Sequence, residues 1–382
     1  MVSDPVAVFF ILAAIVYISI RLEARFNFVR SLGAALVGIL LGMLLSNVGI
    51  LPGDSITYDF LIGPGISAAI VLILLSVDIR SVKKAGPTMV KAFGIGAFGT
   101  AIGSMIMGFI LFPSIGTETW KLCGQFTGTY TGGGLNYAAV GQALETSSDL
   151  FTAGIAADVI VTAIWMVACL SAPVILGYRV NINSRRDQNI PVSTNKQEHT
   201  LEHSLYNSGQ PVQLIHLASL AAITIGSIWF AGFLAVRFSF FPEVLWLTTI
   251  VLIIAQIPAI KKLSGSAILG NYLLLLFLAS NGAQSVIANI IKVGPAVFYF
   301  ALGTVTIHGV VIFGVGRMMR IDPGTLAIAS QANVGGSASA MAMASARRYA
   351  DRILPGVAVG LLGYAGGNYL GLAIAKLMKG LL

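Results

Sequence analysis

The sequence is short of charged residues and of cysteine, and each shortage narrows the class of protein. Charged side chains make up 10% of the chain, whereas hydrophobic residues make up 56% and the mean hydropathy is +0.87. A soluble domain cannot bury that much apolar side chain, so a soluble globular fold is excluded. The two cysteines, Cys123 and Cys169, are too few for a disulfide framework and lack the spacing of a metal site.

Acidic residues are also scarce, with 15 Asp and Glu against 23 Lys and Arg. In so apolar a chain, a basic excess is typical of the cytoplasmic loops of a membrane protein. We therefore expect no nucleic-acid partner. The sequence also lacks a Ser-His-Asp set, a metal-ligand cluster and a phosphate-binding loop in a convincing context. An enzyme is not expected, and neither is a cofactor.

Long apolar runs are what the chain has instead. Ten of them reach or approach the length of about 20 residues that a bilayer requires. They span residues 5–20, 31–48, 60–78, 88–112, 151–178, 212–236, 241–260, 265–287, 294–316 and 353–378. If the N-terminus lies outside, 18 Lys and Arg fall on the inner side and 5 on the outer side, as the positive-inside rule requires. The sequence predicts an all-α, multi-pass protein embedded in the lipid bilayer of the inner (plasma) membrane.

Two further apolar segments, 122–144 and 324–346, are interrupted by glycines and are too broken for ordinary spans. We interpret each as a re-entrant helical hairpin, the first entering from outside and the second from inside. Non-helical backbone at membrane depth is tolerated only where it is buried in protein or lines a cavity. The hairpins therefore predict a cavity or a binding site.

The two hairpins carry related motifs. Gly133-Gly134 and Gly335-Gly336 lie 202 positions apart, as do Asp149 and Asp351. Five spans per half is an odd number, so the two halves must have opposite orientations. We predict inverted repeats at residues 1–178 and 212–382, with a cytoplasmic linker at 179–211.

Polar side chains accompany these glycines. Backbone carbonyls and hydroxyls suit Na⁺, and helix N-termini suit a carboxylate, so paired broken helices point to a transport site. The alternative is that the glycines only allow helices to pack closely. The candidate site residues in the hairpins are Thr129, Tyr130, Thr131, Gly133, Gly134, Asn136, Gln331, Asn333, Gly335, Gly336, Ser337 and Ser339.

Asp158 is an acidic residue about eight positions into its span. A carboxyl group at membrane depth is costly, which makes Asp158 a candidate for binding a coupling cation or carrying a proton. The alternative is a hydrogen bond that serves packing alone. Candidate Na⁺ ligands are Thr131, Asn136, Asn333 and Asp158. Other polar residues in or near spans are Asn281, Gln284, Asn368 and His308, and we interpret the last as a hydrogen-bonded buried histidine rather than a proton relay.

The motifs Thr129-Tyr130-Thr131-Gly132-Gly133, followed by Asn136-Tyr137, and Ala332-Asn333-Val334-Gly335-Gly336 resemble the YjcL-like family of bacterial membrane proteins (domain of unknown function 819). The resemblance covers essentially the whole chain. That family is similar to a wider group of cation/proton antiporters and of bile-acid, glutamate:sodium and 2-hydroxycarboxylate symporters. Similarity to the last of these implies sodium-coupled elevator transport of a carboxylate. It also implies that Gly133, Gly134, Asn136, Asn333, Gly335, Gly336 and Ser337 line the site.

One departure from the wider group concerns charge. Arg347, Arg348 and Arg352 lie near the inner surface rather than within the second hairpin. A di- or tricarboxylate is therefore in doubt, and a zwitterion or a neutral polar solute stays open.

The resulting hypothesis is a secondary active transporter that moves a small organic anion or zwitterion together with Na⁺. The hairpin tips would form the site, and the hairpin-bearing bundle would slide against a scaffold that forms a homodimer. Two alternatives remain. One is proton-coupled antiport or export through Asp158, and the other is a passive channel, because glycine-rich filters also use backbone carbonyls.

Overall fold

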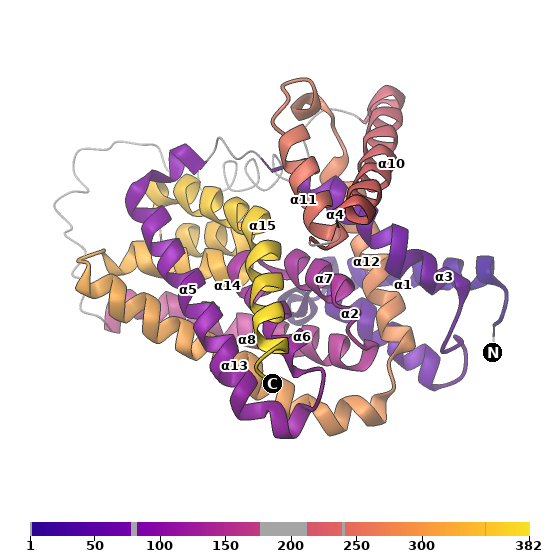
Figure 1. Ribbon diagram of the computed structural model, residues 1–382, viewed down its shortest axis with the longest axis horizontal. Helices are drawn as coiled ribbons and strands as arrows, with labels where there is room; N and C mark the ends of the chain where they lie inside the picture. Colours follow the sequence, from indigo (N-terminus) through magenta and orange to yellow (C-terminus); the bar gives the residue numbers. More distant parts are fainter. Residues whose placement is uncertain (1, 78–81, 176–211, 239–240, 348) are drawn as a thin grey trace.

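The computed structural model describes residues 2–77, 82–175, 212–238, 241–347 and 349–382, and all regular structure within these ranges is helical (Figure 1). The predicted linker at 179–211 lies outside the described residues. Within the described ranges, eight helices are long and apolar enough to cross a membrane. Two shorter apolar helices, Gly33–Asn47 and Glu243–Ile254, coincide with the remaining two predicted spans. The predicted class, an all-α multi-pass membrane protein, is confirmed.

The helices follow one another with few long connections. They are α1 (Pro5–Arg25), α2 (Asn27–Asn47), α3 (Ile56–Phe60), the π-helix η1 (Leu61–Gly65), α4 (Ile66–Leu74), α5 (Val82–Ile115), α6 (Thr119–Gly132), α7 (Gly134–Ala143), α8 (Ser148–Ile175), α10 (Leu214–Arg237), α11 (Glu243–Ile254), the 3₁₀ turn η4 (Ile260–Lys262), α12 (Ser266–Gln284), α13 (Ile287–Met318), α14 (Pro323–Ala346) and α15 (Ala350–Lys379). The predicted span 60–78 is thus interrupted by a π-helix that contains Pro64. A proline cannot donate the backbone hydrogen bond that a regular helix requires there.

The helices form two bodies (Figure 1). The first, here called the scaffold bundle, consists of α1, α2, α3, η1, α4, α10, α11 and α12. Its core includes Leu12, Tyr58 and Leu276, all fully buried. The second, here called the hairpin bundle, consists of α5, α6, α7, α8, α13, α14 and α15. Both predicted hairpins therefore lie in one body, packed against helices from both halves of the chain.

α5 and α13 cross in close contact within the hairpin bundle. A Cβ atom added to Gly99 would lie 2.8 Å from Val311 Cβ, and one added to Gly103 would lie 2.7 Å from Thr304 O. Neither position has room for a larger side chain. Small residues let helix backbones approach each other in this way within a membrane, so the glycines of α5 fix the distance between the two helices that support the hairpins.

Candidate functional site

Each predicted hairpin contains one glycine with a non-helical backbone. Gly133 separates α6 from α7 with φ 94° and ψ 177°, and Gly336 interrupts α14 with φ 76° and ψ −168°. Residues with side chains rarely adopt this region. The non-helical residue is thus the first glycine of the Gly133-Gly134 motif and the second glycine of the Gly335-Gly336 motif. In the first hairpin the conformational requirement falls on Gly133 rather than on Gly134, which is helical and has open space where a Cβ would be.

The two breaks are in contact. A Cβ on Gly133 would lie 3.6 Å from Gly336 Cα, and a Cβ on Gly336 would lie 3.5 Å from Gly132 O. Tyr364 of α15 lies beside both breaks. A Cβ on Gly133 would lie 3.5 Å from its ring, and a Cβ on Gly336 would lie 3.2 Å from its hydroxyl. Segments from opposite halves of the sequence thus meet at their non-helical points.

Close packing accounts for three other glycines of the first hairpin, Gly124, Gly128 and Gly132. Glycines spaced four apart on α6 face glycines spaced four apart on α15. A Cβ on Gly371 would lie 2.7 Å from Gly124 O, and one on Gly367 would lie 2.9 Å from Gly128 O. A third pair, Gly132 and Gly363, is also in contact. The packing interpretation therefore fits this stripe, which the sequence shows as two GxxxGxxxG patterns and which our site prediction missed.

The hairpins also contain buried polar atoms without partners among the described residues. They include Thr129 Oγ1, Asn136 Oδ1, Asn333 Oδ1 and both amide atoms of Gln331, and these four side chains are fully buried. The amide nitrogens of the two asparagines are bonded, Asn136 Nδ2 to Gly363 O at 3.0 Å and Asn333 Nδ2 to Phe93 O at 3.1 Å. An unpaired buried polar group is costly, and most such groups in native proteins bind water or a ligand. The free oxygens are of the type that hard cations prefer.

The remaining candidates of the hairpins have local neighbours. Thr131 Oγ1 donates to Thr127 O at 2.7 Å, so this hydroxyl is already bonded within its own helix. On α14, a Cβ on Gly335 would lie 2.5 Å from Ser339 Oγ and 2.7 Å from Gln331 Nε2. Gln331 and Ser339 therefore flank Gly335, on either side of the second break.

Asp158 faces the first hairpin from α8. Thr162 Oγ1 donates to its carboxylate at 3.4 Å, and the side chains of Tyr130 and Tyr137 are its other neighbours. The matching position in the second half is Gly360. A Cβ there would lie 2.5 Å from Ser337 N, so this position must stay small for the second hairpin to pack on α15. Asp158 accordingly has no counterpart in the second half.

A cavity of about 100 Å³ lies beside the hairpin tips, between the two bundles. The hairpin bundle contributes Leu135, Ser337, Leu361 and Tyr364, and the scaffold bundle contributes Ile73, Ser76, Ala267, Asn271 and Leu274. The polar residues that the sequence suggested do not line this cavity. Their side chains donate hydrogen bonds to other groups: Asn281 to Phe277 O, Gln284 to Ser280 O and Asn368 to Thr248 Oγ1. Nothing in the sequence distinguished Asn271 from these.

His308 links the two hairpins through α5 and α13. Its Nδ1 lies 2.8 Å from Gly96 O, and its Nε2 lies 2.9 Å from Ser330 Oγ. Thr100, which is 3.0 Å from the same ring, donates to Tyr130 O at 2.8 Å. These partners assign the proton to Nδ1, with Nε2 accepting from Ser330. Both ring nitrogens are bonded, which agrees with the interpretation of His308 as a hydrogen-bonded buried histidine.

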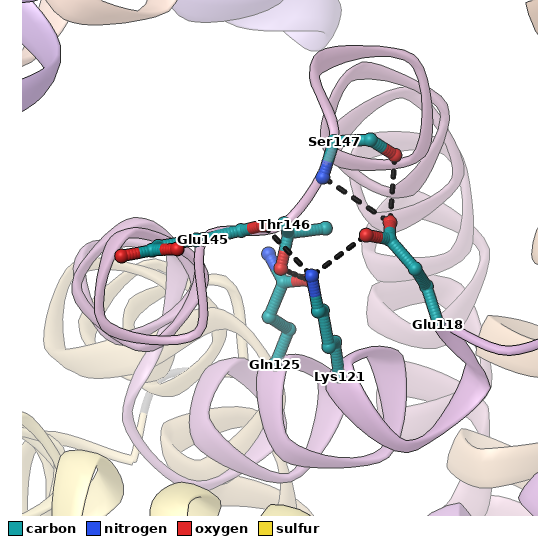
Figure 2. A network of polar contacts seen from close by, with 6 residues as sticks. All are labelled: Glu118, Lys121, Gln125, Glu145, Thr146 and Ser147. Carbon is teal, nitrogen blue, oxygen red and sulfur yellow. Dashed lines mark hydrogen bonds and ion pairs between the residues drawn. The ribbon is translucent and has the colours of Figure 1, made fainter.

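A carboxylate closes the base of the first hairpin (Figure 2). Glu118 accepts hydrogen bonds from Lys121 Nζ at 2.6 Å and from Ser147 Oγ at 2.7 Å, and Lys121 also donates to Glu145 O. Partial burial acts to raise the pKa of Glu118, but the donors from Lys121 and Ser147 together outweigh it and hold the pKa below its usual value. The two ends of the hairpin are thereby joined.

The second hairpin has a similar closure. Asp322 accepts from Thr325 N at 3.1 Å, at the start of α14, and from Arg352 Nη1 at 2.6 Å. Arg352 lies at the start of α15 and stacks on the ring of Tyr349. Each hairpin is thus joined at its base and meets the other at its tip.

These features define a multi-pass α-helical membrane protein in which two broken helical segments meet beside a small cavity. The chain belongs to the DUF819 family, described as a protein of unknown function, whose family model matches residues 7–381. The chain is similar to the uncharacterized membrane protein YjcL of Bacillus subtilis (strain 168), with 27% identity over 366 residues. That match covers 93% of this chain and 92% of the relative. The predicted family membership is confirmed.

Proposed function

We propose that the protein is a secondary active transporter that carries a small organic anion or zwitterion together with Na⁺. The observation that supports this most directly is the contact between the breaks at Gly133 and Gly336, beside a cavity between two bundles. Discontinuous helices from two repeats, meeting near the bilayer midplane, are the usual site of substrate and coupling ion in secondary transporters.

Reciprocal contacts support the inverted repeat and, with it, ten spans and two re-entrant hairpins. Thr100 and His308 are 208 positions apart in the sequence and lie 3.0 Å from each other. At the same offset, Gly99 corresponds to Ile307 and Gly103 to Val311. A Cβ on Gly99 would contact Val311, and a Cβ on Gly103 would contact Ile307. Such exchanged contacts are expected where two equivalent elements meet about a two-fold axis.

The position of the cavity supports elevator movement. Ser76 follows the end of α4, and Asn271 lies near the start of α12. In the predicted topology, both are at the inner ends of their spans. The tips therefore stand beside the cytoplasmic half of the scaffold bundle in this conformation. The repeat implies a second conformation with the tips beside Ser67 and Ser280, the positions that match Asn271 and Ser76 in the opposite halves. A scaffold that forms a homodimer would hold one bundle still while the other moves.

The free oxygens of Thr129, Asn136 and Asn333 favour Na⁺ as the coupling ion. Proton coupling through Asp158 is the second candidate, because none of the ion pairs formed by the described residues involves this carboxylate. A passive channel is the third, and the two-body arrangement favours it least.

Transport by purified protein in liposomes tests these alternatives. Uptake of a carboxylate or amino acid should require an inward Na⁺ gradient and should saturate. Asp158→Asn should abolish the ion dependence while thermal stability in detergent stays near that of the wild type. Uptake driven by a pH gradient alone, and lost in Asp158→Asn, would replace Na⁺ with H⁺. Flux that neither saturates nor responds to either gradient would point to a channel and overturn the proposal.

A further inference from the structure

We propose that the cavity beside the hairpin tips binds its solute through a single carboxylate, which the Ser337 hydroxyl and the starts of two half-helices hold, and that it rejects a second negative charge. This assignment rests on the proposed transport function, because it takes the cavity to be the solute site. It deepens that function by naming the charge class of the solute.

The described residues that line the cavity carry no charged side chain. They are Ile73, Ser76, Leu135, Ala267, Asn271, Leu274, Ser337, Leu361 and Tyr364. No lysine or arginine is among them to balance a charged solute, and no carboxylate is among them to attract a cation. Among the described lining groups, only backbone dipoles are therefore left to balance a charge on the solute.

Two half-helix starts supply these dipoles. Leu135 is the second residue of α7, and Ser337 is the first residue after the break in α14, and both line the cavity. A helix leaves its first N–H groups without partners inside the helix. Each N-terminus acts as roughly half a positive charge, so two of them balance about one negative charge. A dianion would leave roughly one charge that these two helix starts do not balance, which is unfavourable.

The Ser337 hydroxyl points to a ligand independently of the dipoles. Its side chain is 2% exposed and lines the cavity, and no residue within the described ranges bonds its hydroxyl. A buried hydroxyl normally has a partner, and a carboxylate oxygen would accept its hydrogen. Tyr364 lies on the same side, close to Gly336. The carboxylate-binding end of the cavity is therefore formed by the hairpin bundle.

The opposite end suits a short, uncharged body. Ile73 and Leu274 are apolar, and Ser76 Oγ already donates to Ile73 O at 2.6 Å. Asn271 Nδ2 donates to Ala267 O at 2.8 Å, which leaves Asn271 Oδ1 able to accept from a hydroxyl of the solute. A full ammonium group would be poorly balanced by this one neutral oxygen. The cavity thus fits a small monocarboxylate better than an amino acid.

Ligand-induced thermal stabilisation of the purified full-length protein, in Na⁺-containing detergent solution, tests the assignment. The probes are lactate, alanine and succinate at pH 7. Lactate should stabilise the protein saturably and more strongly than alanine, and succinate should have no effect. Ser337→Ala should weaken lactate binding at least about tenfold, because it removes a hydrogen bond to a charged group. Ser219→Ala, on α10, is the matched control and should bind lactate normally.

Two opposite charges placed at one position complete the test. Asn271→Asp should abolish lactate binding, and Asn271→Lys should allow succinate to bind. These variants decide the question even if Ser337→Ala fails to fold. Binding of succinate to the wild type at least as tightly as lactate, or stronger binding of alanine, overturns the single-carboxylate assignment, as does an absence of binding by all three probes. Lactate binding without Na⁺-driven uptake would instead overturn the transport proposal and leave the cavity assignment standing.

Discussion

Replacing Gly133 by alanine should destabilise the protein, whereas the same change at the adjacent Gly134 should not. Gly133 has φ 94° and ψ 177°, and the nearest atom to an added Cβ is 3.5 Å away. The penalty is therefore conformational rather than steric, and a side chain in this region costs about 1–3 kcal/mol. Gly134 is helical and open, so alanine there should stabilise the helix by about 0.5–1 kcal/mol.

The two substitutions should thus differ by about 1.5–4 kcal/mol in unfolding free energy. Titration of the detergent-solubilised protein with a denaturing detergent, followed by circular dichroism, measures this difference. Gly336→Ala should resemble Gly133→Ala, with a small added cost because its Cβ would lie 3.2 Å from Tyr364 Oη. Gly226→Ala, at an open helical position on α10, is the control. Equal stability of Gly133→Ala and Gly134→Ala would refute the positive-φ break, and with it the meeting of the hairpin tips.

Three further predictions concern packing, pH and topology. Gly367→Val should lower the unfolding free energy by about 1–3 kcal/mol through overpacking, because the new side chain would meet Asn136 and Gly128 O. Gly366→Val, at an open position on the same helix, is the control and should change the stability little. Similar effects of the two substitutions would argue against the α6–α15 glycine stripe. The lowered pKa of Glu118 means that its ionised form stabilises the fold above the ordinary carboxyl pKa of about 4.3, and that this contribution is lost as the pH falls through the lowered folded pKa. Thermal stability should therefore fall less between pH 7 and pH 3.5 in Glu118→Gln than in the wild type, and parallel curves would refute a role for this closure. In cells, a membrane-impermeant thiol reagent should label Thr117→Cys from outside but label Ser193→Cys only after permeabilisation, and the reverse pattern would overturn the topology.

Hydropathy located the spans because membrane insertion depends on local composition and length. Ten apolar runs were predicted, and each coincides with a long or a short apolar helix. The boundaries were less accurate. α5 has a non-helical residue at Gly86, close to the predicted start near 88, whereas α11 ends at Ile254 rather than near 260. Helix ends depend on individual backbone hydrogen bonds, which hydropathy averages over.

The motifs located the two broken helical segments but not the residue at which each one breaks. Gly133-Gly134 and Gly335-Gly336 are equivalent dipeptides in the sequence. The residue with positive φ is nevertheless the first glycine of one pair and the second glycine of the other. Both non-helical glycines lie against the opposite hairpin and against Tyr364. Those contacts join residues from opposite halves of the chain, and no local pattern encodes them.

The sequence by itself determined the class of protein, the places where helices cross or break, and the polar groups near the breaks, because these follow from composition, periodicity and residue chemistry along short stretches. Only the tertiary structure decided that the two breaks touch, that most hairpin glycines serve packing, and that Asn271 and Ser76 face the tips. Those facts depend on how two distant halves of the chain pack, and packing is decided by the shapes of surfaces that form only when the helices come together.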